Sequence, residues 1–274
     1  MLAGTRLLIT GVVTTDSIAF ATAVRSQALG AEVILTTLER DRALCEEAAG
    51  QLPVTPDVLA LDVTQPDDFG LLVDQLRQRW DALDGALHAV AFAPRDALAG
   101  DFLAASPDGV NLAFQISAFS YASLARVLSE LAPPRGGALV GLDFDAAGAW
   151  PVYNWMGVCK AALESVNRYL ARDLGPRNIR ANLIAAGPLH TRAAGGIPEF
   201  DRLVDAWGNR APMTWNPSDP TPVADAACFL LSDAARAITA EILHVDGGYH
   251  AMAAPLRPTN THPPQTRSSL EAGC

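Results

Sequence analysis

The chain has 274 residues, 50% of them hydrophobic and 18% charged, enough for the core of one large domain or two small ones. Its formal net charge of -10 argues against nucleic acid or an anionic membrane surface as a partner. The cysteines form no C-x-x-C pair, so neither a zinc site nor a disulfide framework is indicated. Without a secretory signal or an apolar run of about 20 residues, the chain is expected to be a cytoplasmic enzyme.

Short apolar runs alternate with longer amphipathic ones along the chain. We predict strands over 6–10, 31–37, 57–63, 85–92, 137–144, 179–187 and 240–248. We expect helices over 17–29, 42–50, 69–80, 112–131, 152–173 and 223–232. This alternation predicts a single α/β domain with a Rossmann-like, doubly wound parallel sheet of seven strands. Ligands of such sheets bind beyond the carboxyl ends of the strands.

Two segments interrupt the alternation. Residues 188–215 are rich in proline, glycine and tryptophan, and we interpret this long connection as a substrate flap. Residues 254–274 are rich in proline, threonine and serine and lack apolar periodicity, so we expect a flexible tail. The predicted nucleotide-binding domain therefore spans residues 1–253.

The ends of the first three predicted strands carry candidate nucleotide contacts. Gly11 permits a tight turn, and Ser17 can cap a helix whose amides would bind phosphate oxygens. The G-x-G-x-x-G fingerprint is absent, so this turn alone also fits an ordinary capped helix. Asp62 could accept from an adenine amino group or cap the next helix. Glu39 favours a free ribose 2′-hydroxyl, although the adjacent Arg40 weakens that inference.

One tyrosine and one lysine form the strongest candidate catalytic pair. Lys160 is the single lysine beside 19 arginines, which indicates a position that needs a compact ammonium, with chance as the alternative. Tyr153 lies seven residues earlier, so on a helix both side chains would share one face about 10 Å apart. The phenol could donate to a developing oxyanion while the ammonium binds cofactor hydroxyls; core packing of the tyrosine is the alternative.

Two other reactive side chains are expected to be structural. His88 lies within a predicted strand and is expected to be a packed histidine rather than a base. Cys159 is expected to face away from the tyrosine–lysine side of its helix.

Short motifs between about residues 5 and 250 carry a resemblance to a known family. They are G-x5-S-I-A (11–19), LDV (61–63), HAVAFAP (88–94), ISAFSYAS (116–123), LDFD (142–145), Y-N-W-M with K (153–160), AAGPL-x-T (185–191) and VDGG (245–248). On these motifs the chain resembles the enoyl-acyl carrier protein reductases of the short-chain dehydrogenase/reductase superfamily, most closely the mycobacterial type that isoniazid targets. Ordinary ketone-reducing members place the tyrosine four residues before the lysine, and here that position is Met156.

The resemblance implies a role for each matching residue. Tyr153 would donate to the substrate thioester carbonyl, Lys160 would hold the nicotinamide ribose, and Phe144 would lie beside the nicotinamide. Ala93 and Met156 would line the substrate channel together with Tyr153. The cofactor-binding residues would be Gly11, Ser17, Ile18, Leu38, Asp62, Val63, Val90, Ala91, Lys160, Leu189 and Thr191.

The implied activity is NADH-dependent reduction of the trans-2 double bond of enoyl thioesters in type II fatty acid synthesis. The substrate would be carried on acyl carrier protein or coenzyme A, and the assembly would be a homotetramer. One alternative is an enoyl thioester reductase of a specialised-metabolite pathway, and another is a catalytically silent nucleotide-binding sensor. The intact Tyr153 and Lys160 argue against the sensor, and Met156 disfavours a ketone reductase.

Ala240 and the segment from Thr191 to Arg210 depart from the family pattern. Ala240 stands where glycine is usual in the last strand, which predicts crowding of the backbone there. The segment from Thr191 to Arg210 looks shorter than in the mycobacterial type, which predicts a preference for shorter acyl chains.

Overall fold

Seven parallel strands form one sheet in the order β3-β2-β1-β4-β5-β6-β7, within residues 1–256, the part of the chain that a computed structural model describes. The strands are β1 (Arg6–Thr10), β2 (Glu32–Thr37), β3 (Val58–Ala60), β4 (Gly85–His88), β5 (Gly137–Asp143), β6 (Ile179–Ala186) and β7 (Ile242–Val245). The prediction of an α/β fold with a Rossmann-like, seven-stranded parallel sheet is therefore confirmed.

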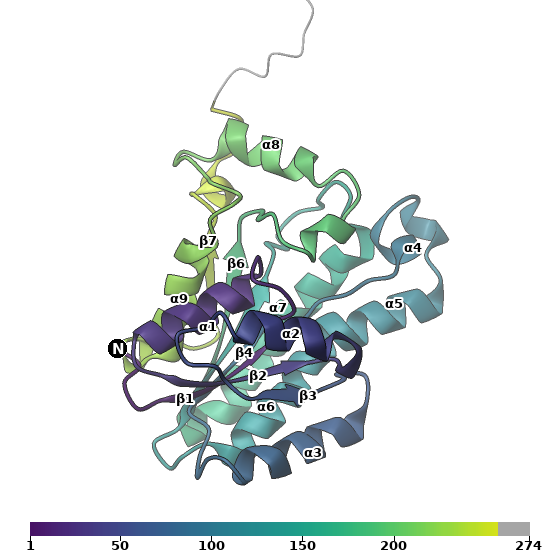
Figure 1. Cartoon of the computed structure of the whole chain (residues 1–274). Coiled ribbons are helices and arrows are strands. Elements are labelled where there is room, and N and C mark those ends of the chain that lie inside the picture. The colour runs from purple at the N-terminus through teal and green to yellow at the C-terminus, as the bar shows by residue number, and fades with distance from the viewer. Residues whose placement is uncertain (257–274) are drawn as a thin grey trace, which may run out of the picture.

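Helices cover both faces of this sheet (Figure 1). They are α1 (Ile18–Ala28), α2 (Arg42–Ala49), α3 (Pro66–Arg77), α4 (Arg95–Leu98), α5 (Pro107–Phe114), α6 (Ser120–Leu131), α7 (Asn154–Leu174), α8 (Asp201–Arg210) and α9 (Thr221–Leu231). A π-helical turn, Gln115–Phe119, joins α5 directly to α6. In Figure 1, α8 stands apart from the sheet, beyond the helices that cover it.

Alternate residues of the strands enter two separate cores. In β1, Leu7 and Ile9 belong to the core that contains buried residues of α1, α2 and α9. Leu8, between them, belongs to the core that contains buried residues of α3, α6 and α7. Successive side chains of a strand point to opposite faces, so a sheet covered on both sides needs continuous apolar strands. This is why the central strands were recognisable from short apolar runs.

The strand order places a switch point between β1 and β4. The chain moves outward from β1 through β2 to β3, then returns to pair β4 with the other side of β1. Crossovers on the two sides of β1 therefore diverge, which leaves a crevice at the carboxyl ends of β1 and β4. The site described below lies along this edge.

The helices differ from the sequence prediction at several positions: α3 lies three residues earlier than predicted, and α4 was not predicted. The helix predicted over 112–131 begins earlier, at Pro107, because the Oγ of Ser106 accepts a hydrogen bond from the backbone N–H of Gly109 at 3.1 Å. The sequence prediction missed α8, which lies inside the expected flap. Its two buried residues, Leu203 and Trp207, are four apart, and this spacing was the available signal.

Most of the predicted tail falls outside the described residues, because the description ends at residue 256. The domain boundary at residue 253 therefore stays a prediction. Among residues 1–256, none of the helices has both the length and the apolar character required to cross a bilayer.

The last strand is shorter than the predicted 240–248, and this changes the meaning of Ala240. This residue precedes β7, has a φ of 65°, and its N–H donates to the carbonyl of Ala181 at 2.8 Å. A left-handed conformation costs an L-residue roughly 1–2 kcal/mol relative to glycine. The expected backbone crowding is thus an unfavourable dihedral angle in the turn that leads into β7.

We expect Ala240→Gly to raise the free energy of unfolding by up to about 1 kcal/mol, because relief of the dihedral strain exceeds the added entropy of the unfolded chain. Urea unfolding at fixed protein concentration measures the change. The matched control is Ala237→Gly, an exposed residue of the same turn with a negative φ, which should lower stability instead. Equal destabilisation by both substitutions would contradict the strain at Ala240.

Candidate active site

The residues proposed from the sequence lie at the carboxyl ends of six neighbouring strands. Gly11 and Ser17 follow β1, Leu38 follows β2, Asp62 and Val63 follow β3, Val90 and Ala91 follow β4, Phe144 follows β5, and Leu189 and Thr191 follow β6. Because the sheet is entirely parallel, these ends share one edge. Residues spread over nearly 200 positions of the sequence are thus collected on one side of the molecule.

The turn after β1 meets two requirements of a dinucleotide site. Gly11 has a φ of 83°, and a Cβ atom built there would lie 2.1 Å from the carbonyl oxygen of Ala89, so only glycine fits between the two strand ends. Ser17 is the N-cap of α1, and its Oγ accepts from the N–H of Phe20 at 3.0 Å. The positive end of α1 therefore faces the crevice, where it can receive a pyrophosphate.

The ends of β2 and β3 supply the part of the edge expected to hold adenosine. The Oδ1 of Asp62 accepts from the N–H and the hydroxyl of Thr64, at 2.9 and 2.7 Å. It therefore orders the turn after β3, while Gln65 takes the N-cap position of α3. Glu39, following Leu38, forms an ion pair with Arg42 at 2.9 Å, and the hydrogen bond from Arg42 lowers the pKa of Glu39.

Residues 89–93 follow β4 as irregular backbone rather than as the predicted continuation of the strand. The N–H of Ala89 donates to the Oγ1 of Thr10 at 3.1 Å. The Oγ of Ser117 accepts from the N–H of Phe92 at 3.0 Å and donates to its carbonyl oxygen at 3.1 Å. Ser117 belongs to the π-helical turn, a feature that often occurs at functional sites. This serine, which the sequence analysis did not single out, fixes the segment that carries Val90 and Ala91.

His88, the last residue of β4, is a packed histidine, as expected. Its side chain is buried, its Nε2 is 2.7 Å from the Oγ of Ser120, and its ring meets Tyr121 edge-on at 5.4 Å. Burial, reinforced by the nearby positive charge of Lys160, lowers the pKa of His88 to about 3. The imidazole is therefore neutral at physiological pH and contributes shape and a hydrogen bond.

Tyr153 precedes the first turn of α7, which corrects the prediction of a helix beginning at 152. Its φ of -125° is not helical, and its neighbours Val152 and Asn154 have φ angles of 56° and 31°. Positive φ angles at residues other than glycine are costly, above all at a β-branched residue, and such strain gathers at functional sites. The ring of Tyr153 lies 5.0 Å from that of Phe144. The strained turn thus brings the phenol against the aromatic residue that follows β5.

Lys160 is buried, with 5% of its surface exposed. Its Nζ donates to the carbonyl oxygen of Leu142 at 2.8 Å, which joins the middle of α7 to the end of β5. Burial lowers the pKa of Lys160, while the negative charge of Asp143 acts in the opposite direction. The ammonium has further donor hydrogens beyond the one directed at Leu142, and they are available to ligand hydroxyls.

Asp143 is a buried acidic residue that the sequence analysis did not single out. It is the last residue of β5, and neither carboxylate oxygen has a hydrogen-bond partner within the described residues. Burial raises the pKa of Asp143 to about 7, opposed by the positive charge of Lys160. The same desolvation, together with the charge of Asp143, raises the pKa of Tyr153 far above its usual range. The phenol is consequently a proton donor at any physiological pH.

An apolar cluster surrounds the phenol of Tyr153. Its buried members are Leu98, Ala113, Tyr153, Met156 and Cys159, and Ala93, Phe144, Trp150 and Ile197 pack against them. Ala93 and Met156 thus share one cluster with Tyr153, and their place along a substrate channel stays a prediction. The expectation that Cys159 faces away was wrong, because Cys159 is three residues from Met156 and shares its face of α7. Burial raises the pKa of the Cys159 thiol to about 11, so the thiol is un-ionised.

The segment after β6 closes the other side of the edge. Leu189 is buried in the core beneath α1 and α9. The Nε1 of Trp215 donates to the carbonyl of Pro188 at 2.8 Å, and the Oγ1 of Thr191 accepts from the N–H of Ala194 at 3.2 Å. The base of the expected flap is therefore fixed on both sides of Leu189.

Comparison with known proteins gives consistent matches. The family model described as enoyl-(acyl carrier protein) reductase matches residues 11–250. The chain is 40% identical over 262 residues to the NADH enoyl-(acyl-carrier-protein) reductase of Mycolicibacterium smegmatis, covering 90% of this chain and 97% of that protein. It is 39% identical over 255 residues to the corresponding protein of Neisseria meningitidis, covering 90% and 95%. Its identity to that of Escherichia coli is 36% over 251 residues, again covering 90% and 95%.

The depressed pKa of His88 gives a testable dependence of stability on pH. Below about pH 6.5 the unfolded chain binds a proton at His88 that the folded chain does not accept until about pH 3. Stability is therefore lost as the pH falls through that interval, and this residue accounts for about 2 kcal/mol between pH 7 and pH 5.

We expect His88→Gln, which can keep a hydrogen bond to Ser120, to reduce the fall in unfolding free energy between pH 7 and pH 5 by about 2 kcal/mol. Urea unfolding at the two pH values measures it. The control is His190→Gln, a substitution of an exposed histidine. If the two variants showed the same acid sensitivity as the unmodified chain, the buried neutral imidazole would be refuted.

Proposed function

This chain belongs to the enoyl-(acyl carrier protein) reductase family, and on that premise we propose that it reduces the trans-2 double bond of an enoyl thioester with NADH. One observation carries the proposal: the strained turn before α7 places a proton-bearing phenol against Phe144, and the buried Lys160 ammonium stands at the same strand end. A phenol fixed in this way can donate to a carbonyl oxygen on which negative charge develops, while the ammonium is placed to bind cofactor hydroxyls.

The chemistry divides between cofactor and protein. NADH, when bound, supplies the hydride for the β-carbon of the substrate, and a proton from solvent, added at the α-carbon, completes reduction of the double bond. The Tyr153 hydroxyl donates to the thioester carbonyl oxygen, on which negative charge develops. Its raised pKa keeps the proton in place, so the phenol acts as a hydrogen-bond donor throughout. The Lys160 ammonium holds the ribose hydroxyls, and the apolar cluster around Tyr153 provides the surface on which the acyl chain packs.

The strand ends provide a matching place for the cofactor. In this proposal the pyrophosphate lies at the N-terminus of α1, and the adenosine lies at the ends of β2 and β3. The nicotinamide lies between the ends of β4, β5 and β6. The assigned contacts are Gly11, Ser17, Ile18, Leu38, Asp62, Val63, Val90, Ala91, Lys160, Leu189 and Thr191. The close fit of Gly11 against Ala89 and the capped helix start after Ser17 support this placement.

The acyl substrate is assigned to the apolar cluster, where Ala93 and Met156 line its path and Phe144 positions the nicotinamide. We propose an acyl carrier protein thioester as the substrate, in keeping with the names of the relatives, and coenzyme A as an alternative carrier. We further propose a cytoplasmic homotetramer active in type II fatty acid synthesis. Exposed apolar side chains on α5, the π-helical turn and α7 support self-association: Leu112, Phe114, Phe119, Val158 and Tyr169.

We expect Tyr153→Phe to lower kcat with a trans-2-enoyl thioester by about 100- to 1000-fold, the usual effect of removing one oxyanion donor. The dissociation constant for NADH should change little, because the phenol is assigned to the substrate carbonyl. The assay follows the loss of NADH absorbance, with Tyr169→Phe, an exposed tyrosine of α7, as the control.

Turnover by Tyr153→Phe at the rate of the control would refute the assigned role. Tight NADH binding by the unmodified chain, with no turnover of any enoyl thioester, would instead favour a nucleotide-binding sensor on the same fold. Turnover restricted to an unusual thioester would favour the specialised-metabolite alternative.

The proposed oligomer has its own test. We expect light scattering of the purified chain to give four chain masses, and we expect Phe119→Asp to lower that mass, since a carboxylate would replace an exposed apolar ring. The matched control is Leu71→Asp, a more exposed apolar position on α3. A monomer in the unmodified chain would contradict the proposed assembly.

A further inference from the structure

A chain of aromatic rings extends from Tyr153 to the C-terminal side of β7. Phe144, which touches Tyr153, has its ring centre 5.0 Å from that of Trp150 and 5.6 Å from that of Trp207. Trp150 in turn lies 5.2 Å from Trp207 and 5.5 Å from Tyr249. These rings come from the turn before α7, from α8 and from the segment after β7. Three distant parts of the sequence thus form one aromatic wall, comprising Phe144, Trp150, Trp207 and Tyr249.

Trp150 connects this wall to the reacting centre. It packs against the cluster that contains Tyr153 and Met156, and equally against the cluster of Trp207 and Tyr249. Trp207 and Tyr249 are 2% and 7% exposed, so Trp150 has a buried support behind it. On this side of Tyr153 the ring of Phe144 comes first, and the indole of Trp150 lies against Phe144 and packs on the same cluster.

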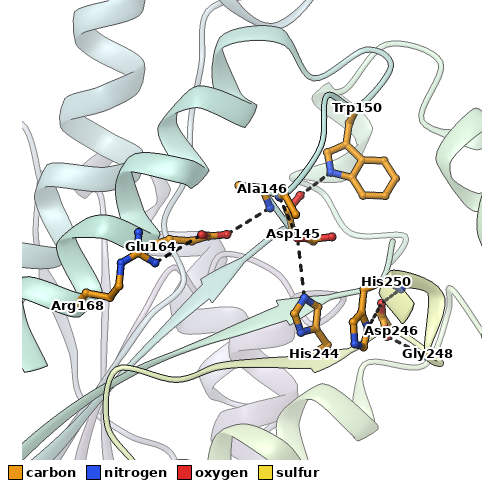
Figure 2. Close-up of polar contacts among 10 residues, drawn as sticks. Asp145, Ala146, Trp150, Glu164, Arg168, His244, Asp246, Gly248 and His250 are labelled. Atoms are coloured by element: carbon orange, nitrogen blue, oxygen red, sulfur yellow. Dashed lines mark hydrogen bonds and ion pairs between the residues drawn. The ribbon is translucent and has the colours of Figure 1, made fainter. Parts of the chain in front are cut away.

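Hydrogen bonds hold the indole in one orientation. Its Nε1 donates to the carbonyl oxygen of Asp145, as Figure 2 shows. The same loop is held from a second side, because the N–H of Ala146 donates to Glu164 of α7 at 3.3 Å (Figure 2). His244 of β7 lies 3.9 Å from the Asp145 carboxylate. Rotation of the indole away from the cluster would break the first of these contacts.

The support behind Trp150 is fixed as well. Trp207 stacks on Tyr249 at 3.8 Å, and its Nε1 donates to the carbonyl of Asp246 at 3.0 Å. The guanidinium of Arg210 covers the ring of Tyr249 at 4.4 Å. The Asp246 carboxylate accepts from the N–H groups of Gly248 and His250, both at 2.8 Å, and so fixes the turn that bears Tyr249. A wall held in this way yields little to an entering chain.

We propose that Trp150 determines the acyl-chain length that the enzyme accepts, closing the pocket behind Tyr153 so that short enoyl thioesters are preferred to long ones. The inference rests on the proposed reductase function and deepens it by naming the substrate class. The sequence also predicted a preference for shorter acyl chains, but from the short segment between Thr191 and Arg210. Here the determinant is one indole, which lies outside the flap in sequence and packs against Trp207 of α8 within it.

The test compares kcat/KM for crotonyl-coenzyme A and trans-2-dodecenoyl-coenzyme A. The unmodified enzyme should prefer the crotonyl substrate. Trp150→Ala should raise the dodecenoyl-to-crotonyl ratio of kcat/KM by at least about tenfold, the effect that a hydrophobic pocket obtains from a single methylene. Trp150→Leu retains more apolar volume and should raise the ratio less. This second variant keeps the test valid if Trp150→Ala does not fold. The matched control is Trp80→Ala, since Trp80 hydrogen-bonds to Glu32 at 3.1 Å, outside both clusters around Tyr153 and Tyr249.

The inference would be overturned if the unmodified enzyme preferred the dodecenoyl substrate. It would also be overturned if neither Trp150 variant changed the dodecenoyl-to-crotonyl ratio of kcat/KM. In both cases the reductase function would stand. A ratio that rises equally in Trp80→Ala would overturn the inference too, because the effect would then not be specific to the wall. Failure of the unmodified chain to oxidise NADH with either coenzyme A thioester and with the corresponding acyl carrier protein thioesters would refute the proposed function, and the inference with it.

Discussion

The hydrogen bond from the Lys160 ammonium to the carbonyl oxygen of Leu142 is the contact on which the site depends. It fixes the middle of α7 against the end of β5, and the loop between them must then close within the residues from Phe144 to Tyr153. Positive φ angles lie on both sides of Tyr153 at the end of this connection. Within the same connection, the ring of Phe144 packs against those of Trp150 and Tyr153.

Burial of ionisable groups gives this edge of the sheet its electrostatic character. Lys160 and Asp143 are taken from water together, and each shifts the pKa of the other toward its charged form, against the desolvation of both. Tyr153 and His88 respond to the same burial by remaining neutral. The outcome is a site whose donors keep their protons while a single ammonium supplies positive charge, an arrangement suited to stabilising an oxyanion.

The sequence predicted the parts of this structure that follow from local periodicity. Apolar runs predicted the strands, and the alternation of strands and helices predicted a parallel sheet whose carboxyl ends share one edge. The position of Ser17 predicted a helix cap. Apart from the missed helices α4 and α8, the failures concern backbone that departs from regular structure. The prediction that Tyr153 and Cys159 face different sides assumed a helix that begins at residue 152. It was wrong because the backbone before α7 is not helical. The π-helical turn that presents Ser117 depends on tertiary contacts with the segment after β4, which periodicity does not report.

The central claim is that the site needs a compact ammonium at the end of β5, in a chain that otherwise uses arginine. The most direct measurement is the dissociation constant for NADH of Lys160→Arg, with Arg180→Lys as the reciprocal control away from this edge, where Arg180 donates to the carbonyls of Leu230 and Ser232. Lys160 is buried beside Leu142, and a planar guanidinium is larger than the ammonium and directs its donors in a rigid fork. We expect at least a tenfold weaker affinity in Lys160→Arg, of order 1.4 kcal/mol, and no change in the control. An arginine variant that binds NADH as tightly as the unmodified chain would contradict the account.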